Sequence, residues 1–197
     1  QKLWKKGYKM VVGLDEAGRG PLAGPVTAAA VTIVQATLKI KNLKLKIILK
    51  EIKDSKKLSQ KKREKLYELI TENQNIEWGI GRVSEKVIDK INILEATKLA
   101  MIRAIEKLKT KSEKRKARII FLIIDGNFKI DLPIPQKSII KADEKVFSCM
   151  AAGIIAKVTR DRIMERYAKK FPQYGFDKHK GYPTRHHRQR LKKYGPC

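Results

Sequence analysis

The sequence predicts an α/β fold with a mixed β-sheet, and three features lead to that prediction. Short apolar runs that are typical of buried strands occur at Lys9–Leu14, Val26–Val34 and Arg118–Ile124. Amphipathic helical segments are mixed with strands in the rest of the chain. The length of 197 residues and the 42% of apolar residues correspond to one domain with a sizeable core.

Turn-forming residues separate the N-terminal strands. The run that begins at Val26 follows the breaker pair Gly24-Pro25, so we expect an antiparallel pair joined by a glycine-rich turn. Apolar residues and lysines alternate between Thr37 and Lys53, and this period of two favours an amphipathic hairpin around Lys41-Asn42. The hairpin is either a surface insertion without function or a nucleic-acid contact.

Helix-start signals and apolar periodicity locate the remaining elements. Ser59 is a suitable N-cap, and the strongest helical periodicity lies in Lys145–Arg162. The expected elements are a helix from Ser59 to about Glu72, a strand over Ile76–Val83, a short helix capped by Ser84, a longer helix over Ile93–Lys109, a basic linker over Lys109–Arg118, and helices over Lys145–Arg162, Arg160–Phe171 and Thr184–Tyr194.

The charge of the chain indicates a polyanionic partner. Forty-six basic residues against 20 acidic residues leave a net charge of +26, which far exceeds what solubility requires. Nucleic acid is the commonest polyanion. The basic residues are mostly lysines, so the same composition can also come from an AT-biased genome.

Other classes of protein are disfavoured by composition. No uninterrupted apolar run approaches the roughly 20 residues of a membrane span, and the N-terminus lacks the apolar centre of a signal peptide. Two cysteines, Cys149 and Cys197, cannot form a disulfide framework. We therefore expect a cytoplasmic protein without membrane contact. Cys149 falls on the polar side of its predicted helix.

Carboxylates occur where three apolar segments end or begin. Asp15 and Glu16 end the first strand, Asp125 ends a later strand, and Asp143 precedes the strongest helix. If they converge, their mutual repulsion requires cations. Hard oxygen ligands suit Mg²⁺ or Mn²⁺, and two such ions about 4 Å apart can support phosphodiester displacement.

Each carboxylate also has an ordinary structural interpretation. Neighbours on a regular strand point to opposite faces, so Asp15 and Glu16 share a site only if the strand ends or bulges there. Asp125 can be a turn residue, and Asp143 can cap the next helix. The glycine loop Gly18-Arg19-Gly20, directly after the paired carboxylates, makes the set informative, since glycines let the backbone approach a ligand.

Five motifs follow one another along the chain: Gly13–Val26 (GLDEAGRGPLAGPV), Asp54–Ser59 (DSKKLS), Asp125–Asn127 (DGN), the Lys141–Asp161 block and His179–Thr184 (HKGYPT). In this order they resemble the motifs of the ribonuclease HII family, and the resemblance covers roughly residues 9–191.

The resemblance implies a ribonuclease H-like fold, with a mixed five-stranded sheet flanked by helices and a C-terminal helical region. It implies one catalytic domain over residues 1–197, of which about 160–197 form a substrate-binding extension. The implied activity is hydrolysis of the RNA strand in RNA–DNA hybrids and nicking of duplex DNA 5′ of an embedded ribonucleotide, which leaves 3′-hydroxyl and 5′-phosphate ends.

Site residues follow from the motifs. Asp15, Glu16, Asp125 and Asp143 match the carboxylates that bind two Mg²⁺ or Mn²⁺ ions. Gly18, Arg19 and Gly20 match the motif that contacts the ribose 2′-hydroxyl, the one group that distinguishes RNA from DNA. Tyr182 matches the tyrosine that stacks at the RNA–DNA junction. Phosphate contacts are expected from Lys56, Lys57, Lys180 and Arg185.

Some positions depart from the family pattern or carry no assigned chemistry. Ala142 replaces a usual glycine before Asp143, and Gly153 replaces a usual serine in the alanine-rich helix. These changes bring into question the placement of Asp143 and a hydroxyl contact from position 153. The three histidines, His179, His186 and His187, are expected on a solvated or phosphate-facing surface.

Three alternatives remain beside this hypothesis. Ribonuclease HIII usually carries an N-terminal substrate-binding domain, whereas about eight residues precede the first strand here. A binding module that has lost catalysis would not be expected to keep all four carboxylates. A ribosomal or chromatin-like protein explains the charge but not the carboxylates. We expect a monomer; protein partners such as a sliding clamp leave no recognisable signal in the sequence.

Overall fold

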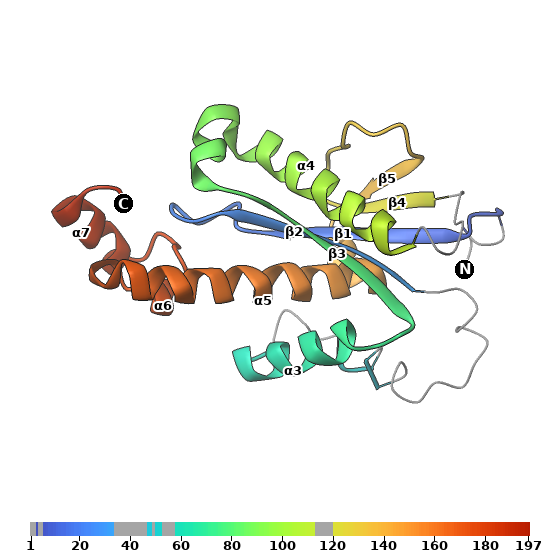
Figure 1. The fold of residues 1–197 in the computed structure, drawn as a ribbon, viewed down its shortest axis with the longest axis horizontal. Helices are drawn as coiled ribbons and strands as arrows, with labels where there is room; N and C mark the ends of the chain where they lie inside the picture. Colours follow the sequence, from blue (N-terminus) through green and yellow to red (C-terminus); the bar gives the residue numbers. More distant parts are fainter. Residues whose placement is uncertain (1–2, 4–5, 34–46, 49, 53–57, 113–119) are drawn as a thin grey trace.

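One five-stranded sheet organises the described part of the chain (Figure 1). The structure is a computed structural model that describes all residues except 1–2, 4–5, 34–46, 49, 53–57 and 113–119. The strands lie in the order β3-β2-β1-β4-β5. Their bounds are Met10–Ala17 for β1, Val26–Ile33 for β2, Ile76–Val83 for β3, Ile120–Asp125 for β4 and Gln136–Ile139 for β5.

The sheet is mixed, as the sequence predicts. β1 pairs antiparallel with β2 and parallel with β4, while β2 pairs antiparallel with β3 and β4 pairs parallel with β5. β1 therefore occupies the centre. Its C-terminal end lies beside the C-terminal end of β4, because parallel strands finish at the same edge. This edge is where acidic residues follow both apolar runs.

β5 is the strand that the residue pattern does not reveal. Its four residues follow Pro133 and Pro135 and include three polar side chains, so they show neither an apolar run nor alternation. The Gln136 side chain links this strand to the preceding loop. Its Oε1 accepts a 3.0 Å hydrogen bond from the Ile130 amide, and its Nε2 donates a 2.9 Å hydrogen bond to the Ile130 carbonyl oxygen. Tertiary pairing with β4 therefore decides this strand.

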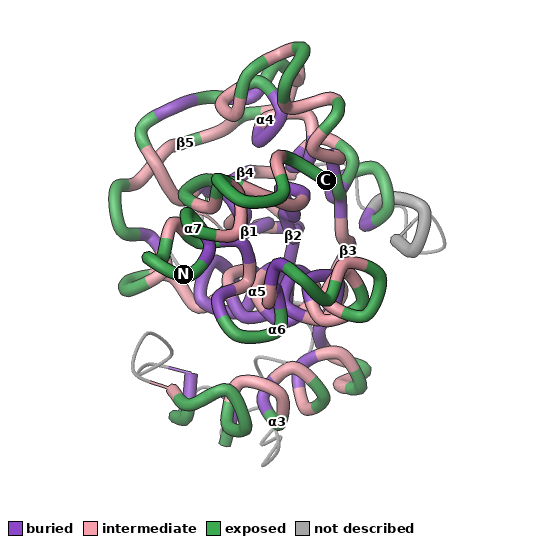
Figure 2. The backbone as a smooth tube through the Cα atoms, turned by 90° about the vertical axis from the view of Figure 1, so that its left-hand side faces the viewer, coloured by how far each residue is buried: buried purple, intermediate pink, exposed green. Residues whose placement is uncertain are grey.

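Helices cover both faces of the sheet (Figure 1). α4 lies on one face, and α5, with α3 outside it, lies on the other. Figure 2 shows buried residues gathered on β1, β2 and α5 in the middle of the molecule. The helices are α3 Gln60–Thr71, α4 Glu85–Ser112, α5 Phe147–Lys170, α6 Phe176–His179 and α7 Arg185–Tyr194, with short 3-10 turns at Ala142–Glu144 and Pro172–Tyr174.

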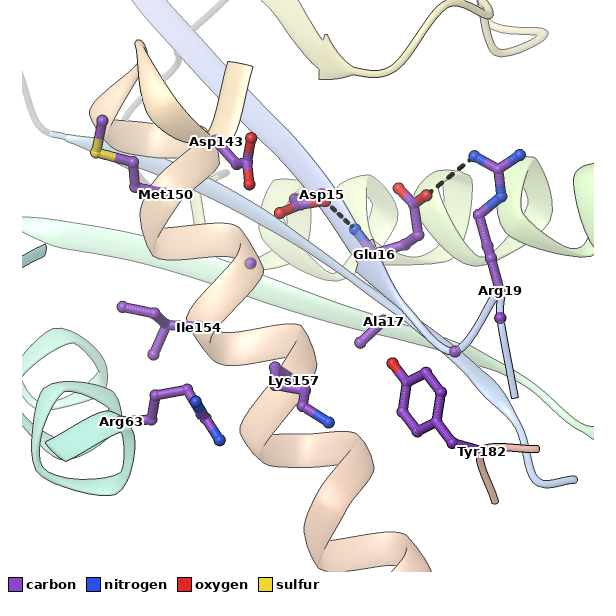
Figure 3. Close-up of a pocket in the computed structure, with 13 residues that line it drawn as sticks. Asp15, Glu16, Ala17, Arg19, Arg63, Asp143, Met150, Ile154, Lys157 and Tyr182 are labelled. Carbon is purple, nitrogen blue, oxygen red and sulfur yellow. Dashed lines mark hydrogen bonds and ion pairs between the residues drawn. The ribbon is translucent and has the colours of Figure 1, made fainter. Parts of the chain in front are cut away.

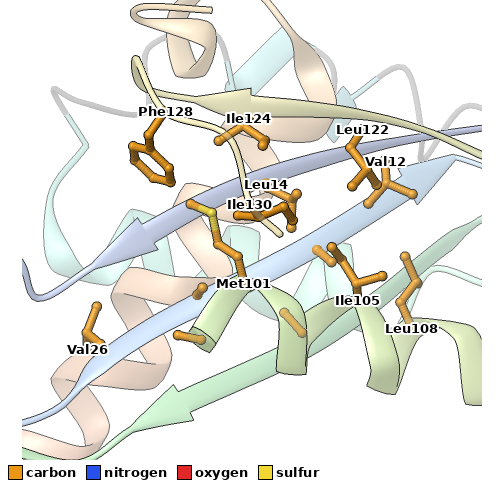
Figure 4. Packing of buried hydrophobic residues seen from close by; sticks show 14 of the residues in the cluster. Val12, Leu14, Val26, Met101, Ile105, Leu108, Leu122, Ile124, Phe128 and Ile130 are labelled. Carbon is orange, nitrogen blue, oxygen red and sulfur yellow. The ribbon is translucent and has the colours of Figure 1, made fainter. Parts of the chain in front are cut away.

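The core on the α4 face is apolar and closely packed (Figure 4). Leu14 from β1, Leu122 from β4 and Met101 from α4 are fully buried there. Glycines in β3 let the backbone of α4 lie directly on the strand: a Cβ atom built on Gly81 would lie 1.9 Å from the carbonyl oxygen of Ala100. This close approach fixes α4 against the sheet.

Most predicted helices are confirmed, with local differences. α3 begins after the N-cap Ser59, whose side chain accepts a hydrogen bond from the Lys62 amide. The short helix expected after Ser84 and the longer helix expected from Ile93 are confirmed, since α4 consists of two helical parts separated by non-helical backbone at Asn92, with φ 65°. The Asn92 side chain accepts hydrogen bonds from the next turn and so caps the second part.

Two predicted boundaries are wrong, and so is the described part of one predicted hairpin. The two helices expected over Lys145–Arg162 and Arg160–Phe171 are one continuous helix, α5, so the proposed boundary near residue 160 lies inside it. The basic linker expected from Lys109 is helical as far as Ser112, and residues 113–119 lie outside the described residues. Much of the hairpin expected over Thr37–Lys53 lies outside them as well. Its described residues 47–48 and 50–52 are helical, not extended, and Ile48 and Ile52 are buried in a cluster with residues of α3 and α5.

Two of the three C-terminal histidines are buried, so the expectation that all three lie on a solvated or phosphate-facing surface is wrong. His179 and His187 are buried, with ring centroids 4.4 Å apart, and only His186 of the three is exposed. His187 Nδ1 lies 3.0 Å from the Tyr182 carbonyl oxygen, and the His179 ring contacts Phe176. The histidines therefore support the loop that carries Tyr182.

No described helix is both long and apolar enough to cross a bilayer.

Candidate active site

Three aspartates from distant parts of the sequence meet at the edge where β1 and β4 end. The strand register pairs Leu14 with Ile124, so Asp15 and Asp125 follow side by side. Asp143 comes from the 3-10 turn between β5 and α5. One carboxylate oxygen from each aspartate lies within 4.8 Å of the other two. In Figure 3, the Asp15 and Asp143 side chains point toward each other beside α5.

Hydrogen bonds hold two of these carboxylates in place. Asp125 Oδ1 accepts a 2.8 Å hydrogen bond from the Ala142 amide, which links the end of β4 to the turn that carries Asp143. Asp15 Oδ1 accepts a 2.7 Å hydrogen bond from the Glu16 amide. The family departure at Ala142 thus retains the backbone group that fixes Asp125, and the Ala142 side chain is buried.

Glu16 lies beside this group rather than inside it. β1 remains paired with β2 through Ala17, so Asp15 and Glu16 point to opposite faces of a continuing strand. Glu16 Oε1 accepts a 3.2 Å hydrogen bond from Arg19, whereas its buried Oε2 has no hydrogen-bond partner. Both acidic residues line the same pocket, because β1 extends beyond the end of β4.

The carboxylates are electrostatically unfavourable without a cation. Burial, followed by repulsion from Glu16 and Asp125, raises the pKa of Asp15 well above its ordinary value. Burial also raises the pKa of Glu16, and the Arg19 guanidinium opposes that shift. A bound divalent cation would reverse the repulsion that these groups experience.

The donor set fits a hard divalent cation. The three aspartate oxygens and the uncompensated Glu16 oxygen are oxygen ligands of the kind that Mg²⁺ and Mn²⁺ prefer. No other group of three or more histidine, cysteine or acidic ligand atoms converges in this way among the residues that the structure describes. The site therefore has the composition of a carboxylate-bound cation centre.

A pocket of about 410 Å³ joins the carboxylates to the glycine loop and Tyr182. Gly18, Arg19 and Gly20 line one side, directly after β1, and Tyr182 lies beside Gly20. The Tyr182 side chain is 41% exposed and points into the pocket (Figure 3). The structure thus brings together the predicted substrate-recognition residues and the predicted carboxylates.

Two basic residues in the pocket were missed in the sequence. Arg63 from α3 and Lys157 from α5 also line it (Figure 3). The Lys157 ammonium lies 5.4 Å from the centroid of the Tyr182 ring and forms an ion pair with Asp161. Both residues lie on helices rich in other cations, so the sequence alone gave no reason to select them.

The basic residues that were predicted to contact phosphates have other surroundings. Lys56 and Lys57 lie outside the described residues. The Lys180 ammonium is bonded to Glu165 and to the Asp177 carbonyl, away from the pocket. Arg185 is exposed on α7 beside a second, open hollow.

Gly153 lies against the carboxylate of Asp15. A Cβ atom built at this position would lie 2.4 Å from Asp15 Oδ2, so the absent side chain leaves space for the carboxylate. Cys149 on the same helix is buried, which corrects its expected polar position. Its thiol lies 3.6 Å from the Ile123 carbonyl oxygen, and burial raises its pKa, so it is held as a neutral thiol.

Solved structures share this arrangement of sheet and helices. The ribonuclease H2 from Pyrococcus horikoshii superposes with a TM-score of 0.68 at 27% identity, covering 95% of this chain and 90% of that one. The ribonuclease HII from Archaeoglobus fulgidus, solved as a complex with PCNA, gives a TM-score of 0.65 at 28% identity and covers 94% and 88%. The molecule is therefore a nuclease of the ribonuclease H fold.

Sequence relatives specify the family. The family model for ribonuclease HII matches residues 12–197. A ribonuclease HII from Caldanaerobacter subterraneus is 48% identical over all 197 residues, which span 74% of that relative. The chain belongs to the ribonuclease HII family, a group of endoribonucleases that act on RNA in RNA–DNA hybrids.

Proposed function

We propose that this chain is a divalent-metal-dependent endonuclease that hydrolyses the RNA strand of RNA–DNA hybrids and nicks duplex DNA on the 5′ side of an embedded ribonucleotide. Two observations support this function. Asp15, Asp125 and Asp143 converge within 4.8 Å of one another, and Asp15 and Asp143 line the pocket that also holds the glycine loop. In this proposal, residues 1–197 act as one catalytic domain, and the helices after about residue 160 bind the duplex.

Each part of the pocket has a chemical role in the proposed reaction. Asp15, Glu16, Asp125 and Asp143 would hold two Mg²⁺ or Mn²⁺ ions when substrate is bound. Such ions supply a polarised phosphate and an activated water nucleophile. The protein must therefore hold its four acidic groups ionised and close together, and must orient the phosphodiester beside them.

The glycine loop and Tyr182 would select the scissile position. The backbone of Gly18 to Gly20 can approach a ribose closely and hydrogen-bond its 2′-hydroxyl. The 2′-hydroxyl of this ribose adjoins the phosphate on its 3′ side, not the scissile phosphate on its 5′ side. A water molecule would therefore attack the scissile phosphate, and the products would carry 3′-hydroxyl and 5′-phosphate ends. Tyr182 would stack on the next sugar, where an additional hydroxyl is disfavoured. Arg63 and Lys157, which line the same pocket, would face the phosphate backbone.

A nicking assay tests this function. The substrate is duplex DNA with one ribonucleotide, incubated with no metal, Mg²⁺ or Mn²⁺, and the product ends are identified by ligation and phosphatase treatment. We expect metal-dependent cleavage 5′ of the ribonucleotide. Asp125→Asn should lower cleavage by roughly 10³-fold while leaving duplex binding nearly unchanged, as expected for loss of a central electrostatic group. Near-normal cleavage by this variant would contradict the proposal, and so would cleavage without metal.

A further inference from the structure

Arg160 is the largest fully buried side chain in the described part of the protein. It lies on α5, about two turns beyond Gly153, and it donates hydrogen bonds to three backbone carbonyl groups. Its Nε atom donates to Pro25 at 2.9 Å, Nη1 to Lys180 at 2.8 Å and Nη2 to Ala23 at 2.9 Å. A buried guanidinium is costly unless its donors are satisfied, so this arrangement is specifically built.

The three carbonyls belong to two separate loops. Ala23 and Pro25 lie in the connection from β1 to β2, just after the glycine loop, whereas Lys180 lies two residues before Tyr182. The loops also contact each other directly, since the Leu22 amide donates a 2.9 Å hydrogen bond to the Gly181 carbonyl. Arg160 therefore sits at the junction between the two segments to which the proposed function assigns substrate recognition.

Close packing prevents the two loops from shifting independently. A Cβ atom on Gly18 would lie 2.6 Å from Arg160 Nε, and one on Gly181 would lie 2.3 Å from the Ala23 carbonyl oxygen. Both glycines have positive φ, at 115° and 86°. The glycine loop, the guanidinium and the Tyr182 loop thus form one block whose geometry depends on the central arginine.

We propose that Arg160 is a positioning residue that holds Tyr182 at a fixed place relative to the glycine loop and thereby sets the preference for an isolated ribonucleotide over a continuous hybrid. This inference rests on the proposed function. An isolated ribonucleotide offers a 2′-hydroxyl at one sugar and none at the next. Discrimination therefore requires the glycine loop and Tyr182 to examine adjacent sugars at the same time.

Arginine suits this position better than lysine. The planar guanidinium directs several donors in fixed directions, so one side chain can hold carbonyls from two loops. A lysine ammonium retains the charge, but its flexible stem and single nitrogen cannot reproduce the fork. Arg160→Lys is therefore the informative substitution, because it separates the geometry of the donors from their charge.

The matched control lies on the same helix. Arg162 is two residues further along α5, its side chain is 42% exposed, and it forms an ion pair with Glu64 outside the pocket. Arg162→Lys makes the same chemical change away from the two loops. Circular dichroism and thermal unfolding of each variant would establish that folded proteins are compared.

The experiment measures kcat/KM of the full chain on two substrates, a DNA duplex with one ribonucleotide and a continuous RNA–DNA hybrid. We expect Arg160→Lys to lower kcat/KM on the first substrate at least tenfold more than on the second. Arg162→Lys should leave this ratio within twofold of the wild type. Arg160 is inferred to act through Tyr182. The double variant Arg160→Lys with Tyr182→Ala should therefore differ less than twofold from Tyr182→Ala alone in the ratio of kcat/KM on the two substrates.

The outcomes separate this inference from the proposed function. If the wild type fails to nick at a single ribonucleotide, the proposed function fails, and this inference fails with it. If the wild type nicks but Arg160→Lys lowers both activities equally, the inference alone is overturned. It is also overturned if the effects of Arg160→Lys and Tyr182→Ala on the ratio multiply.

A second variant serves if Arg160→Lys does not fold. Gly181→Ala would place a methyl group against the Ala23 carbonyl and push the two loops apart without changing Arg160. We expect the same selective loss on the single-ribonucleotide substrate. A folded Gly181→Ala protein with an unchanged ratio would overturn the coupling between the loops.

Discussion

α4 and α5 cover opposite faces of the same sheet, yet they differ in what they bury. The described buried residues of α4 are apolar except Thr97, whose hydroxyl bonds back to the Ile93 carbonyl of its own helix. α5 buries Ser148, Arg160 and Asp161 as well as its apolar residues, and it lines the candidate site. One face of the sheet is thus built for packing, whereas the other combines packing with polar groups.

This difference indicates that the α4 face mainly contributes to the stability of the fold, whereas the α5 face also positions the candidate active site. On the α4 face, glycines in β3 serve the closest possible contact between helix and strand. On the α5 face, Gly153 makes room for a carboxylate whose charge the fold disfavours. Substitutions in the core of the first face should therefore change stability without changing the chemistry, whereas substitutions of the acidic groups on the second face should change the chemistry.

The largest change in stability is expected for Gly81→Val. Each added methyl group would collide with the backbone of α4 near Ala100, where no flexible side chain can move away. We expect the free energy of unfolding to fall by about 3–5 kcal/mol, at the upper end for overpacking. Chemical denaturation measures the change, with Arg82→Val as the control, since Arg82 is the exposed neighbour of Gly81 on the same strand. Equal losses in both variants would contradict the packing argument.

Met101→Ala should have the next largest effect. Met101 is fully buried in the α4 core (Figure 4), and its truncation leaves a cavity among Leu14 and Ile105. We expect a loss of about 3 kcal/mol in the free energy of unfolding. Cleavage per folded molecule should stay within twofold of the wild type at 25 °C. The exposed Lys107→Ala on the same helix is the control, and a selective loss of cleavage by Met101→Ala would break the contrast between the two faces.

Asp15→Asn should increase stability while removing activity. The raised pKa of Asp15 means that the folded, metal-free protein disfavours its ionised form, so stability is lost as pH rises from the unfolded value toward the folded one. Asparagine removes that charge. We expect a gain of about 1 kcal/mol at pH 7 in the presence of a chelator, together with loss of cleavage. Thermal unfolding with and without Mg²⁺ tests this, and a destabilised Asp15→Asn protein would contradict it.

The smallest effect concerns His187. Burial lowers its pKa, so the folded protein binds fewer protons than the unfolded chain, and stability falls as pH decreases through about 6.5 toward the lowered value. His187→Asn should remove this contribution, so its stability deficit relative to the wild type should shrink by about 1 kcal/mol between pH 7.5 and pH 5.5. Urea denaturation at both values measures the difference. Asp15 and Glu16 titrate in the opposite sense, but they are common to both proteins, and a pH-independent deficit would contradict the assignment.

Local signals in the sequence were sufficient for much of the fold. Ser59 predicted the start of α3 correctly because a side-chain cap acts on its own turn, and the strand Ile76–Val83 was predicted with its observed bounds. β5 was not predicted from its residues, since it depends on pairing with β4. The buried His179 and His187 were expected in solvent, because no local pattern marks a stacked pair held by a distant loop.

In the candidate site, too, some residues could be predicted from the sequence and others could not. The motifs identified the acidic residues, the glycine loop and Tyr182. In the structure, Asp15, Glu16 and Asp143 line one pocket with the glycine loop and Tyr182, and Asp125 converges with Asp15 and Asp143. The sequence offered no means of choosing Arg63, Lys157 or Arg160 among 46 basic residues. Their surroundings come from helices and loops that are distant along the chain, and charge counts contain no such information.

By itself, the sequence determined the family, the order of most elements and the acidic residues, because motifs and local periodicity are properties of neighbouring residues. Only the tertiary structure decided that Glu16 lies outside the converging group of three aspartates, that Gly153 opens space beside Asp15, and that Arg160 links two loops. These features arise from register and close packing between segments that are far apart in the chain, where a displacement of an ångström or two makes or breaks a contact.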